Sequence, residues 1–323
     1  MVLTLLALLL IMLILLACAW ATHKKINSNK WRLACLGSVF AMSVAPLTLA
    51  VFLLFCLFFN SLPNQIQISN PSIEYTNRIV SEGSRKAVVH LMRIDLSKVK
   101  VWVSPPISTD RQSAYKAMTT SQALERYEAD VAINGSFFIP FKDNHLLDFY
   151  PHSGQAVYPL GDTYYNNRLF GRFGESWPSL IVLNDKKVRI IGKSTVPKLQ
   201  SKIEFGISGR QLIVENATVS RVAKDSFYAR TVVGLNSKNT VLWLAVVDGK
   251  QPNYSDGIRL TTLAAELIKL GVHTAIELDG GGSSTMAVKQ KNKSALVLNR
   301  PIHTNIPYRE RPVVNHLLIR LLP

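Results

Sequence analysis

The sequence predicts an α+β fold: one strand-rich domain of layered mixed sheets with a few helices, behind two N-terminal transmembrane helices. Three observations support this prediction. Residues 2–59 contain two long apolar runs, the rest of the chain contains many short runs rich in β-branched residues, and only two segments of that rest have helical spacing.

The first 59 residues predict a membrane anchor. Residues 2–21 are almost wholly apolar and, at about 1.5 Å per residue, are long enough to cross about 30 Å of hydrocarbon. A second apolar run, residues 33–59, contains Pro46, where a helix would kink. We therefore predict transmembrane helices over residues 1–21 and 33–59. A cleaved signal peptide is the alternative for the first run, and cleavage after the second run would release the domain.

The loop between these runs, residues 22–32, predicts the orientation of the chain. It carries four formal positive charges, on Lys24, Lys25, Lys30 and Arg32. Short loops rich in Lys and Arg stay on the cytoplasmic side of a membrane. We therefore expect a basic cytoplasmic loop and an extracytoplasmic domain, which in a bacterium means the inner membrane and the periplasm.

Cysteine usage separates the anchor from the domain. All three cysteines, Cys18, Cys35 and Cys56, lie in or beside the predicted spans. This excludes a disulfide scaffold, a cysteine nucleophile and a cysteine-based zinc site from the outer domain. Residues 60–84 are polar and contain prolines, which predicts a linker, and residues 85–323 are long enough for one sizeable domain.

The chain is strongly basic. Its formal net charge is +16, and the four cations of the cytoplasmic loop leave +12 for the residues outside the membrane. A basic surface beside a membrane attracts anionic head groups or anionic polymers, although lysines scattered for solubility are the commoner reason for such a charge. Nucleic acid is excluded as a partner, because the sequence has no zinc-finger or RNP-type signature and the predicted compartment is wrong.

The domain is predicted to alternate short strands with turns. Residues 119–128 and 261–270 have helical spacing, and Gly271 is a typical helix stop. Residues 141–173 show little periodicity and predict a loop-like insert. Strands are expected over residues 87–94, 99–103, 131–134, 180–183, 188–191, 211–214, 231–235, 241–247, 273–278 and 313–321.

Residues 277–286 are the strongest candidate for a functional site. Glu277 and Asp279 are two residues apart, so a strand would point both carboxylates to one face. The motif continues with Gly280, Gly281, Gly282, Ser283, Ser284 and Thr285. The glycines let a ligand approach the backbone, and the residues after them supply hydroxyl and N–H donors. This combination favours a ligand site, and a tight hairpin with a polar tip is the alternative.

Three further strand ends carry polar residues. Asn134 and Gly135 end one apolar strand, where a carboxamide can donate to and accept from sugar hydroxyls. Arg230 and Thr231 begin another strand, and a guanidinium can bind a phosphate in a fork geometry. Asp248 ends a third strand and is a candidate carboxylate. The ordinary alternatives are a turn asparagine, a surface ion pair and a turn aspartate.

Five motifs together resemble the phosphodiester glycosidase family, in the family's order and over most of residues 85–320. They are VAINGSFF at 131–138, RTVVG at 230–234, VVDG at 246–249, DGGGSST at 279–285 and RPVVN at 311–315. One position departs from the family pattern, because Ser136 replaces the usual second glycine. The resemblance implies a hydrolase acting on a sugar linked through a phosphodiester. It also adds Arg311 and Asn315 to the candidate substrate-binding residues.

The resemblance determines the chemistry that we expect. Asp279, Glu277 and Asp248 are the candidate catalytic carboxylates, because glycosidic cleavage usually uses one carboxyl as acid and another as nucleophile or base. A phosphate leaving group needs less protonation than an alcohol, so stabilisation by Arg230 and Arg311 gains importance. No histidine is expected to be essential. Clustered carboxylates and hydroxyls also suit Ca²⁺ or Mg²⁺, although the chain has no EF-hand pattern.

We therefore expect a membrane-anchored, extracytoplasmic glycosidase that hydrolyses a sugar-1-phosphodiester bond in an envelope or extracellular glycan. The alternative is a non-catalytic module that binds glycan or takes part in exopolysaccharide assembly, and a third possibility is a membrane-surface scaffold with a basic face. Asp279 separates the first two, because a binder tolerates Asp279→Asn whereas a hydrolase loses most of its rate.

Overall fold

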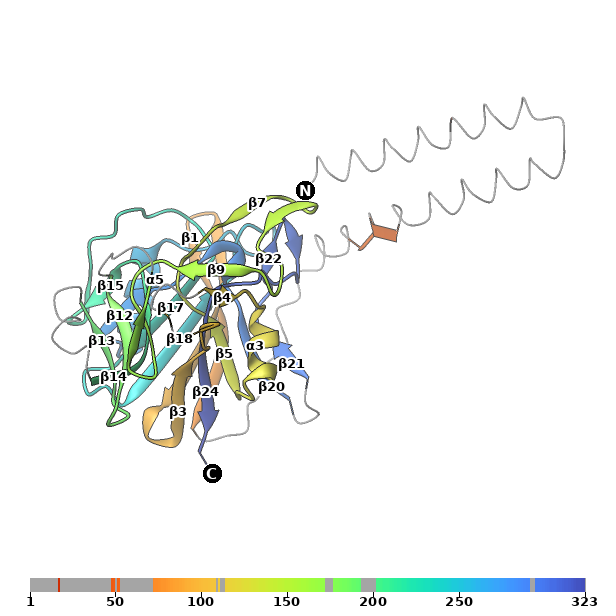
Figure 1. Cartoon of the computed structure of the whole chain (residues 1–323). Coiled ribbons are helices and arrows are strands. Elements are labelled where there is room, and N and C mark those ends of the chain that lie inside the picture. Colours follow the sequence, from red (N-terminus) through yellow and green to blue (C-terminus); the bar gives the residue numbers. More distant parts are fainter. Residues whose placement is uncertain are drawn as a thin grey trace. The chain divides into compact units, whose positions relative to one another are not determined.

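The computed structural model describes residues 72–322 apart from 109, 111–113, 172–176, 193–201 and 291–293, and also residues 17, 48, 49, 51 and 52 (Figure 1). The chain divides into two compact units, Met1–Asn60 and Ser61–Pro323. The predicted spans and cytoplasmic loop lie almost wholly outside the described residues. Among the described residues, no helix is long and apolar enough to cross a membrane.

The second unit is built on an antiparallel seven-stranded sheet (Figure 1). In spatial order its strands are β1 (Ile73–Glu82), β2 (Arg85–Asp95), β18 (Val241–Val247), β17 (Arg230–Leu235), β19 (Thr274–Glu277), β15 (Leu212–Glu215) and β16 (Thr218–Val219).

Two five-stranded sheets accompany the seven-stranded sheet. The first of these, called the second sheet below, has the order β21 (Ala295–Val297), β20 (Met286–Lys289), β5 (Val131–Asn134), β24 (His316–Leu321) and β3 (Val99–Val103). The other has the order β11 (Arg168–Phe170), β10 (Thr163–Tyr165), β14 (Ile203–Ser208), β12 (Ser179–Leu183) and β13 (Val188–Ile191).

Short elements complete the described fold. The small sheets are β4 (Tyr115–Lys116), β9 (Ala156–Pro159) and β6 (Phe138–Ile139), then β7 (Lys142–His145) with β8 (Asp148–Tyr150), and β22 (Ile302–His303) with β23 (Ile306–Pro307). The helical elements are α3 (Thr120–Arg126), α5 (Leu260–Lys269) and the 3₁₀ turns η1 (Leu96–Lys98) and η3 (Gly281–Ser283).

Alternation along the strands sorts side chains into layers. On β18, Leu244 faces the main core, which it shares with Ile133 of β5, because successive strand residues point to opposite faces. Its neighbour Ala245 faces the other side, where Leu263 of α5 covers the seven-stranded sheet. Helix α3 covers the far face of the second sheet, where Leu124 packs on Ala132 and Leu318. The order of layers is therefore α5, seven-stranded sheet, second sheet and α3.

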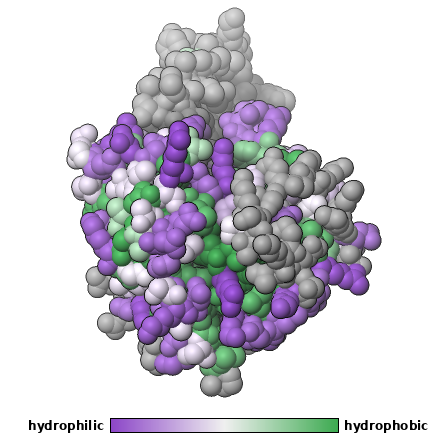
Figure 2. Space-filling model, turned by 90° about the vertical axis from the view of Figure 1, so that its left-hand side faces the viewer, coloured by the Kyte–Doolittle hydropathy of each residue, from purple (hydrophilic) through white to green (hydrophobic). Residues whose placement is uncertain are grey.

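Helix α3 is fixed at its start by a capping box. The side chain of Thr119 accepts from the Gln122 N–H, and the side chain of Gln122 accepts from the Thr119 N–H. Both predicted helices and the predicted strands are confirmed within a few residues, except that the last strand begins at His316 rather than at residue 313. The surface of the face shown in Figure 2 is largely hydrophilic around a narrower apolar strip.

Two sequence predictions need correction. The predicted linker over residues 60–84 contains strand β1, which pairs with β2 along its whole length. Because β1 is an edge strand with mostly half-exposed side chains, its composition is that of a polar linker. The predicted loop-like insert over residues 141–173 contains the short strands β7 to β11. These strands are three or four residues long, too short to show a period.

We predict that Leu263→Ala lowers the free energy of unfolding by about 2–5 kcal/mol, because Leu263 is fully buried between α5 and the sheet. Denaturant unfolding followed by tryptophan fluorescence checks this, since Trp243 packs against the same cluster. Leu147→Ala is the matched control, because Leu147 is 88% exposed, and its effect should be within about 0.5 kcal/mol. Equal effects of the two variants would contradict this packing.

Candidate active site

The turn between β19 and β20 crosses from one sheet to another. Strand β19 ends at Glu277 in the seven-stranded sheet, and β20 begins at Met286 in the second sheet. The N–H of Leu278 donates to the Thr231 carbonyl of β17 at 2.9 Å, and the N–H of Asp279 donates to the Gly135 carbonyl after β5 at 3.0 Å. The hairpin considered from the sequence is therefore wrong, because the turn bridges the ends of two sheets.

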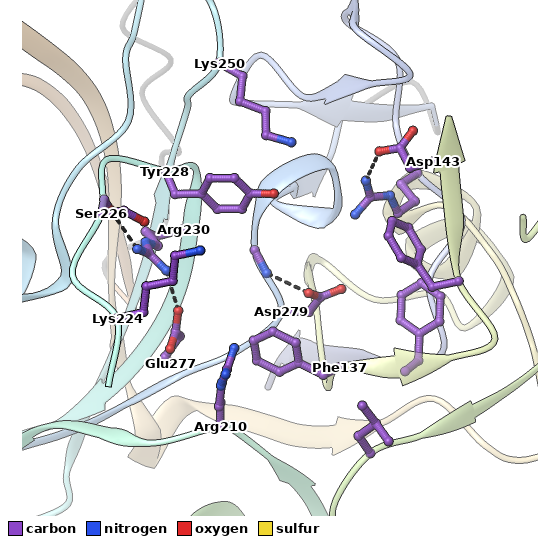
Figure 3. A pocket seen from close by; sticks show the side chains of 15 residues that line it. Phe137, Asp143, Arg210, Lys224, Ser226, Tyr228, Arg230, Lys250, Glu277 and Asp279 are labelled. Atoms are coloured by element: carbon purple, nitrogen blue, oxygen red, sulfur yellow. Dashed lines mark hydrogen bonds and ion pairs between the residues drawn. The ribbon is translucent and has the colours of Figure 1, made fainter. Parts of the chain in front are cut away.

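A pocket of about 530 Å³ lies beside this turn (Figure 3). Three carboxylates and five cationic side chains contribute to its wall, together with four aromatic rings. The lining consists of Phe137, Phe138, Phe141, Asp143, Leu160, Arg210, Lys224, Ser226, Tyr228, Arg230, Lys250, Glu277, Asp279, Gly280 and Arg311. The pocket is thus polar, basic and partly aromatic, which suits an anionic sugar derivative.

Asp279 presents a partly exposed carboxylate to the pocket. Its Oδ1 accepts a hydrogen bond from the Gly280 N–H at 2.9 Å, and its Oδ2 accepts one from the Ser283 hydroxyl at 2.6 Å. Burial raises the pKa of Asp279 to about 6, against the opposing effects of Arg311 and of both hydrogen bonds. A carboxyl group with such a pKa changes its protonation state near neutral pH, as acid–base chemistry requires.

Arg311 is connected to Asp279 through one hydroxyl group. Its Nη1 donates to the Ser283 Oγ at 3.1 Å, and this hydroxyl donates to Asp279. Its Nη2 forms an ion pair with Asp143 of β7. Burial opposes ionisation of Asp143, but its hydrogen bond with His303 and the charge of Arg311 lower its pKa to about 2. Arg311 is therefore held in place from two sides.

Arg230 and Glu277 form a buried ion pair in the pocket wall. Arg230 Nη1 donates to Glu277 Oε1 at 2.6 Å, and Arg230 Nη2 donates to the Ser226 carbonyl at 2.8 Å. The other carboxylate oxygen of Glu277 accepts from Gln211 Nε2 at 2.8 Å. Both oxygens of Glu277 are thus engaged in the described structure by Arg230 and Gln211, and its predicted acid–base role stays a prediction.

The glycines of the turn make room for neighbouring side chains. Gly281 has a φ of +64°, and a Cβ there would lie 2.7 Å from the Tyr228 hydroxyl oxygen. A Cβ on Gly282 would lie 2.5 Å from Arg311 Nη2. The sequence predicted that a ligand approaches this backbone, whereas Tyr228 and Arg311 are the close neighbours of Gly281 and Gly282. Of the three glycines, only Gly280 lines the pocket described here.

Asn134 lies behind the pocket and binds the turn. Its Oδ1 accepts from the Thr231 hydroxyl at 2.8 Å and from the Thr285 N–H at 3.2 Å. Its Nδ2 donates to the Asp279 main-chain carbonyl at 2.6 Å. One fully buried carboxamide therefore joins β5, β17 and the turn, so Asn134 and Thr231 position the site and do not reach the pocket lining.

Gly135, Asn315 and Ser284 also support the site from behind. The Gly135 N–H donates to the Asn315 carbonyl at 2.9 Å, and a Cβ on Gly135 would lie 2.2 Å from Asn315 Oδ1. That oxygen accepts from the Ser136 N–H at 2.8 Å. The Ser284 carbonyl accepts from Asn299 at 2.9 Å. None of these residues is among the lining residues of the described pocket, so their predicted contact with substrate stays a prediction.

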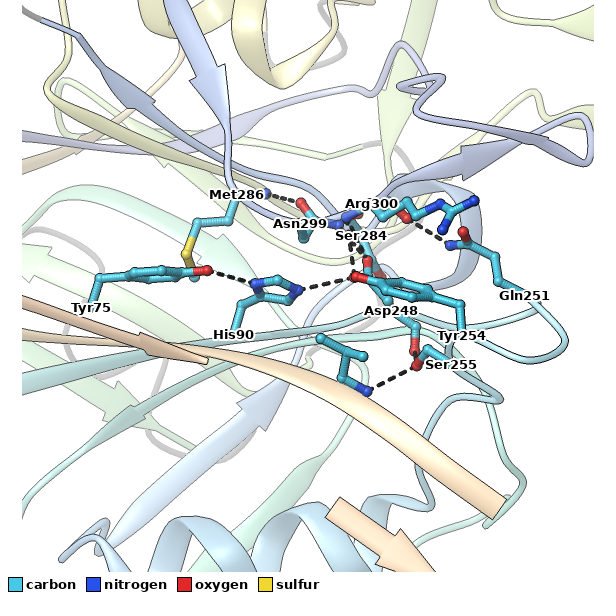
Figure 4. A network of polar contacts seen from close by, with 11 residues as sticks. Tyr75, His90, Asp248, Gln251, Tyr254, Ser255, Ser284, Met286, Asn299 and Arg300 are labelled. Atoms are coloured by element: carbon cyan, nitrogen blue, oxygen red, sulfur yellow. Dashed lines mark hydrogen bonds and ion pairs between the residues drawn. The ribbon is translucent and has the colours of Figure 1, made fainter. Parts of the chain in front are cut away.

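Asp248 lies in a separate buried network (Figure 4). Its Oδ2 is 3.0 Å from His90 Nε2 and accepts from the Tyr254 hydroxyl at 3.0 Å. Its Oδ1 accepts from Asn299 Nδ2 and from the Arg300 N–H, each at 2.9 Å. Burial opposes ionisation, but His90 and these hydrogen bonds hold the pKa of Asp248 below its usual value. The predicted catalytic role of Asp248 is not supported, because β18 delivers it to this network and not to the described pocket.

The Asp248 network reaches the turn through Asn299. The side chain of Asn299 accepts from the Met286 N–H at 2.9 Å, in addition to its donation to Ser284. At the other end, the Tyr75 hydroxyl of β1 lies 2.8 Å from His90 Nδ1 (Figure 4). The network therefore ties the end of the turn to the seven-stranded sheet.

The described residues contain no group of three or more His, Cys, Asp or Glu side chains that could hold a metal ion. Two of the three pocket carboxylates, Glu277 and Asp143, are paired with arginines. Such a donor set does not fit Ca²⁺ or Mg²⁺, which bind several oxygen ligands at once.

Sequence reasoning missed six polar residues of the pocket. Asp143 lies in the segment predicted as a loop, and the others lie in connections between secondary-structure elements. The missed residues are Asp143, Arg210, Lys224, Ser226, Tyr228 and Lys250. The one signal in the sequence was the basic balance of the domain, which indicates an anionic partner without naming residues.

These features define a pocket lined by more cationic than anionic side chains, beside a carboxylate of raised pKa. The model of the phosphodiester glycosidase family matches residues 127–320, more than half of the 323 residues, and the chain belongs to this family.

Solved structures share the fold. The catalytic domain of zebrafish N-acetylglucosamine-1-phosphodiester alpha-N-acetylglucosaminidase, auto-inhibited by its pro-peptide, matches with a TM-score of 0.55 and 21% identity, over 79% of this chain and 85% of that chain. A putative exported protein from Burkholderia pseudomallei matches with a TM-score of 0.53 and 14% identity, over 74% and 75%. A comparison with curated proteins gave no match.

We predict that Gly282→Ala displaces the Arg311 guanidinium and lowers turnover of a phosphodiester substrate by about 100-fold, because a misplacement of about 1 Å at a site costs that much. Steady-state kinetics and circular dichroism check this. Gly192→Ala is the control, because no atom of the described residues lies within 4 Å of its Cβ position. An unchanged turnover rate of Gly282→Ala would contradict a role of the Arg311 guanidinium in turnover.

We predict that Asp248→Ala lowers the free energy of unfolding by about 3–5 kcal/mol, because it leaves His90, Tyr254 and Asn299 without their buried acceptor. Asp185→Ala on an exposed turn is the control and should change stability by less than about 0.5 kcal/mol. An Asp248→Ala variant that keeps its stability and loses only turnover would support the predicted catalytic role of Asp248.

Proposed function

We propose that the protein is a glycosidase that hydrolyses a sugar-1-phosphodiester bond in an envelope or extracellular glycan, from a domain anchored to a membrane by its N-terminal segment. The observation that carries this proposal is the pairing of Asp279 with Arg311 across Ser283 in a basic pocket. Membership of the phosphodiester glycosidase family supports the type of bond. The two apolar runs before residue 60 support the anchor.

In the proposed reaction, the phosphodiester lies against the cationic wall with the anomeric carbon facing Asp279. The bond between the anomeric carbon and the phosphate oxygen breaks, and the electron pair leaves with the phosphate. Arg311 stabilises the charge on the departing oxygen. Ionised Asp279 stabilises the positive charge that develops on the sugar. A water oxygen bonds to the anomeric carbon and becomes the new anomeric hydroxyl with one of its protons, and the other proton passes to the departing phosphate monoester or to solvent. The products are therefore a free sugar and a phosphate monoester.

A poor leaving group must be protonated by an acid as it departs, whereas a phosphate monoester needs no proton donor. The monoester is already stable as an anion, so the cations of the pocket replace a proton donor. This agrees with the geometry, because Glu277 and Asp143 each form an ion pair with an arginine, whereas burial raises the pKa of Asp279 to about 6.

We predict that Asp279→Asn lowers turnover of a sugar-1-phosphodiester by about 10²- to 10⁴-fold. The variant should also be more stable than the parent at pH 7, by about 1–3 kcal/mol. The folded-state pKa of about 6 exceeds the unfolded value of 3.8, so ionisation of this carboxyl destabilises the folded protein as the pH rises from about 4 to 6. Product release by chromatography and thermal melting check both effects.

A stable Asp279→Asn variant with parental turnover would contradict the catalytic role. Equal retention of an uncleaved glycan by parent and variant, with no turnover by either on any sugar-1-phosphodiester, would instead favour a binding module. A parallel assay with chelator should give the parental rate, and a loss of rate there would show that an ion takes part.

The pH dependence gives a second prediction. Because the ionised carboxylate is the active form in this mechanism, kcat should rise with pH through about 6 and level off above it. Initial rates between pH 4.5 and 8 on one substrate check the direction. A rate that falls through the same range would mean that Asp279 acts as a proton donor.

A further inference from the structure

We propose that the pocket contains a second anion-binding subsite, formed by Arg210, Lys224 and Lys250 next to the Arg230–Glu277 ion pair. This inference rests on the proposed function and names its substrate class. The subsite binds a negatively charged oxygen group of the substrate other than the phosphodiester that is cleaved. The substrate is therefore a glycan that carries at least two anionic groups close together.

The charges of the pocket do not balance. The pocket has five cationic side chains and three carboxylates, so it carries an excess of two positive charges when all of them are ionised. A phosphodiester brings one negative charge and leaves one positive charge of the pocket uncompensated. Between chemically similar ligands, the one with a second negative charge is therefore favoured.

Only two of the five pocket cations form ion pairs with carboxylates of the described residues. Arg311 is paired with Asp143, and Arg230 is paired with Glu277. Among the described residues, no carboxylate forms an ion pair with Arg210, Lys224 or Lys250. The excess charge is therefore concentrated on these three side chains.

Lys224 lies on the far side of Asp279 from Asp143. In Figure 3, Lys224 and Arg230 lie on one side of Asp279 and Asp143 lies on the other, while Lys250 lies above Asp279 and Arg210 lies below Lys224. The scissile phosphate belongs next to Arg311, because Arg311 is connected to Asp279 through Ser283 and is paired with Asp143. A second anionic group bound at Lys224 consequently lies across Asp279 from the scissile phosphate.

Aromatic rings hold two of the three cations at the pocket. Lys250 Nζ lies 4.7 Å from the centre of the Tyr228 ring, and Arg210 lies 6.0 Å from the centre of the Phe137 ring. The Tyr228 ring is itself fixed against Gly281. These contacts hold the charged ends of Lys250 and Arg210 at the pocket wall, where a negatively charged group of the substrate can reach them.

Direct binding tests this subsite separately from turnover. The probes are two synthetic compounds with the same sugar-1-phosphodiester, one with a neutral aglycone and one with a phosphate monoester added to that aglycone. A third compound carries a carboxylate there, and a fourth carries the extra phosphate on the sugar. Calorimetry with the full chain carrying Asp279→Asn measures affinity without hydrolysis.

We expect the doubly charged compounds to bind about 10-fold more tightly than the neutral-aglycone compound. Lys224→Gln with Lys250→Gln should reduce that ratio about fivefold, as expected for two solvent-exposed contacts. Lys238→Gln, an exposed lysine outside the pocket lining, should leave the ratio unchanged. Whichever of the phosphate and carboxylate compounds binds more tightly identifies the anionic group that the subsite prefers. Whichever of the two phosphate compounds binds more tightly, the one with the extra phosphate on the aglycone or the one with it on the sugar, identifies where that group is attached.

Equal binding of singly and doubly charged compounds, or an equal effect of Lys238→Gln, would overturn the subsite. Turnover of the neutral-aglycone compound by the parent chain tests the proposed function by itself. Hydrolysis of that compound with no charge preference in binding would support the glycosidase activity and contradict the subsite. A charge preference in binding without hydrolysis of any compound would support the subsite and contradict the glycosidase activity.

Discussion

A single buried carboxamide holds together the parts of the chain that form the pocket. Asn134 bonds at once to Thr231 on the seven-stranded sheet, to the Thr285 N–H and to the Asp279 carbonyl. Because Asn134 itself belongs to the second sheet, these three contacts fix the two sheet ends and the turn in one arrangement. The position of the Asp279 carboxylate thus depends on a contact made behind the pocket, where no substrate reaches.

Two aspartates show how environment assigns roles to the same side chain. Asp248 is surrounded by donors, among them Tyr254, Asn299 and the Arg300 N–H, which favour its charged form in spite of burial. Asp279 has fewer donors and also faces the negative charge of Glu277, so burial dominates and raises its pKa. The first aspartate stabilises the fold, and the second retains a proton equilibrium that chemistry can use.

Much of the fold follows from local pattern. Apolar periodicity predicted α3, α5 and the central strands, because their buried faces leave a regular signal in the sequence. The turn at 279–285 was recognised from its composition. Edge strand β1 was missed because half-exposed residues resemble a linker, and the strands after residue 141 are too short to show a period.

The role of each site residue depended on contacts that sequence cannot give. Glu277 and Asp248 are of the residue types that serve as catalytic acids. The side chain that pairs with each lies far away in the chain: Arg230 pairs with Glu277, and His90 pairs with Asp248. The glycines were predicted to let a ligand approach the backbone, which stays a prediction; the structure places Tyr228 against Gly281 and Arg311 against Gly282. Strand order decides such pairings, and the sequence did not predict it.

The most direct test of the account is the site of bond cleavage. Hydrolysis of a sugar-1-phosphodiester in water enriched in ¹⁸O should place the label on the anomeric hydroxyl of the released sugar, as mass spectrometry can show. That result means that the carbon–oxygen bond beside Asp279 breaks. Label in the released phosphate would mean that the phosphorus–oxygen bond breaks, which would contradict the glycosidase mechanism.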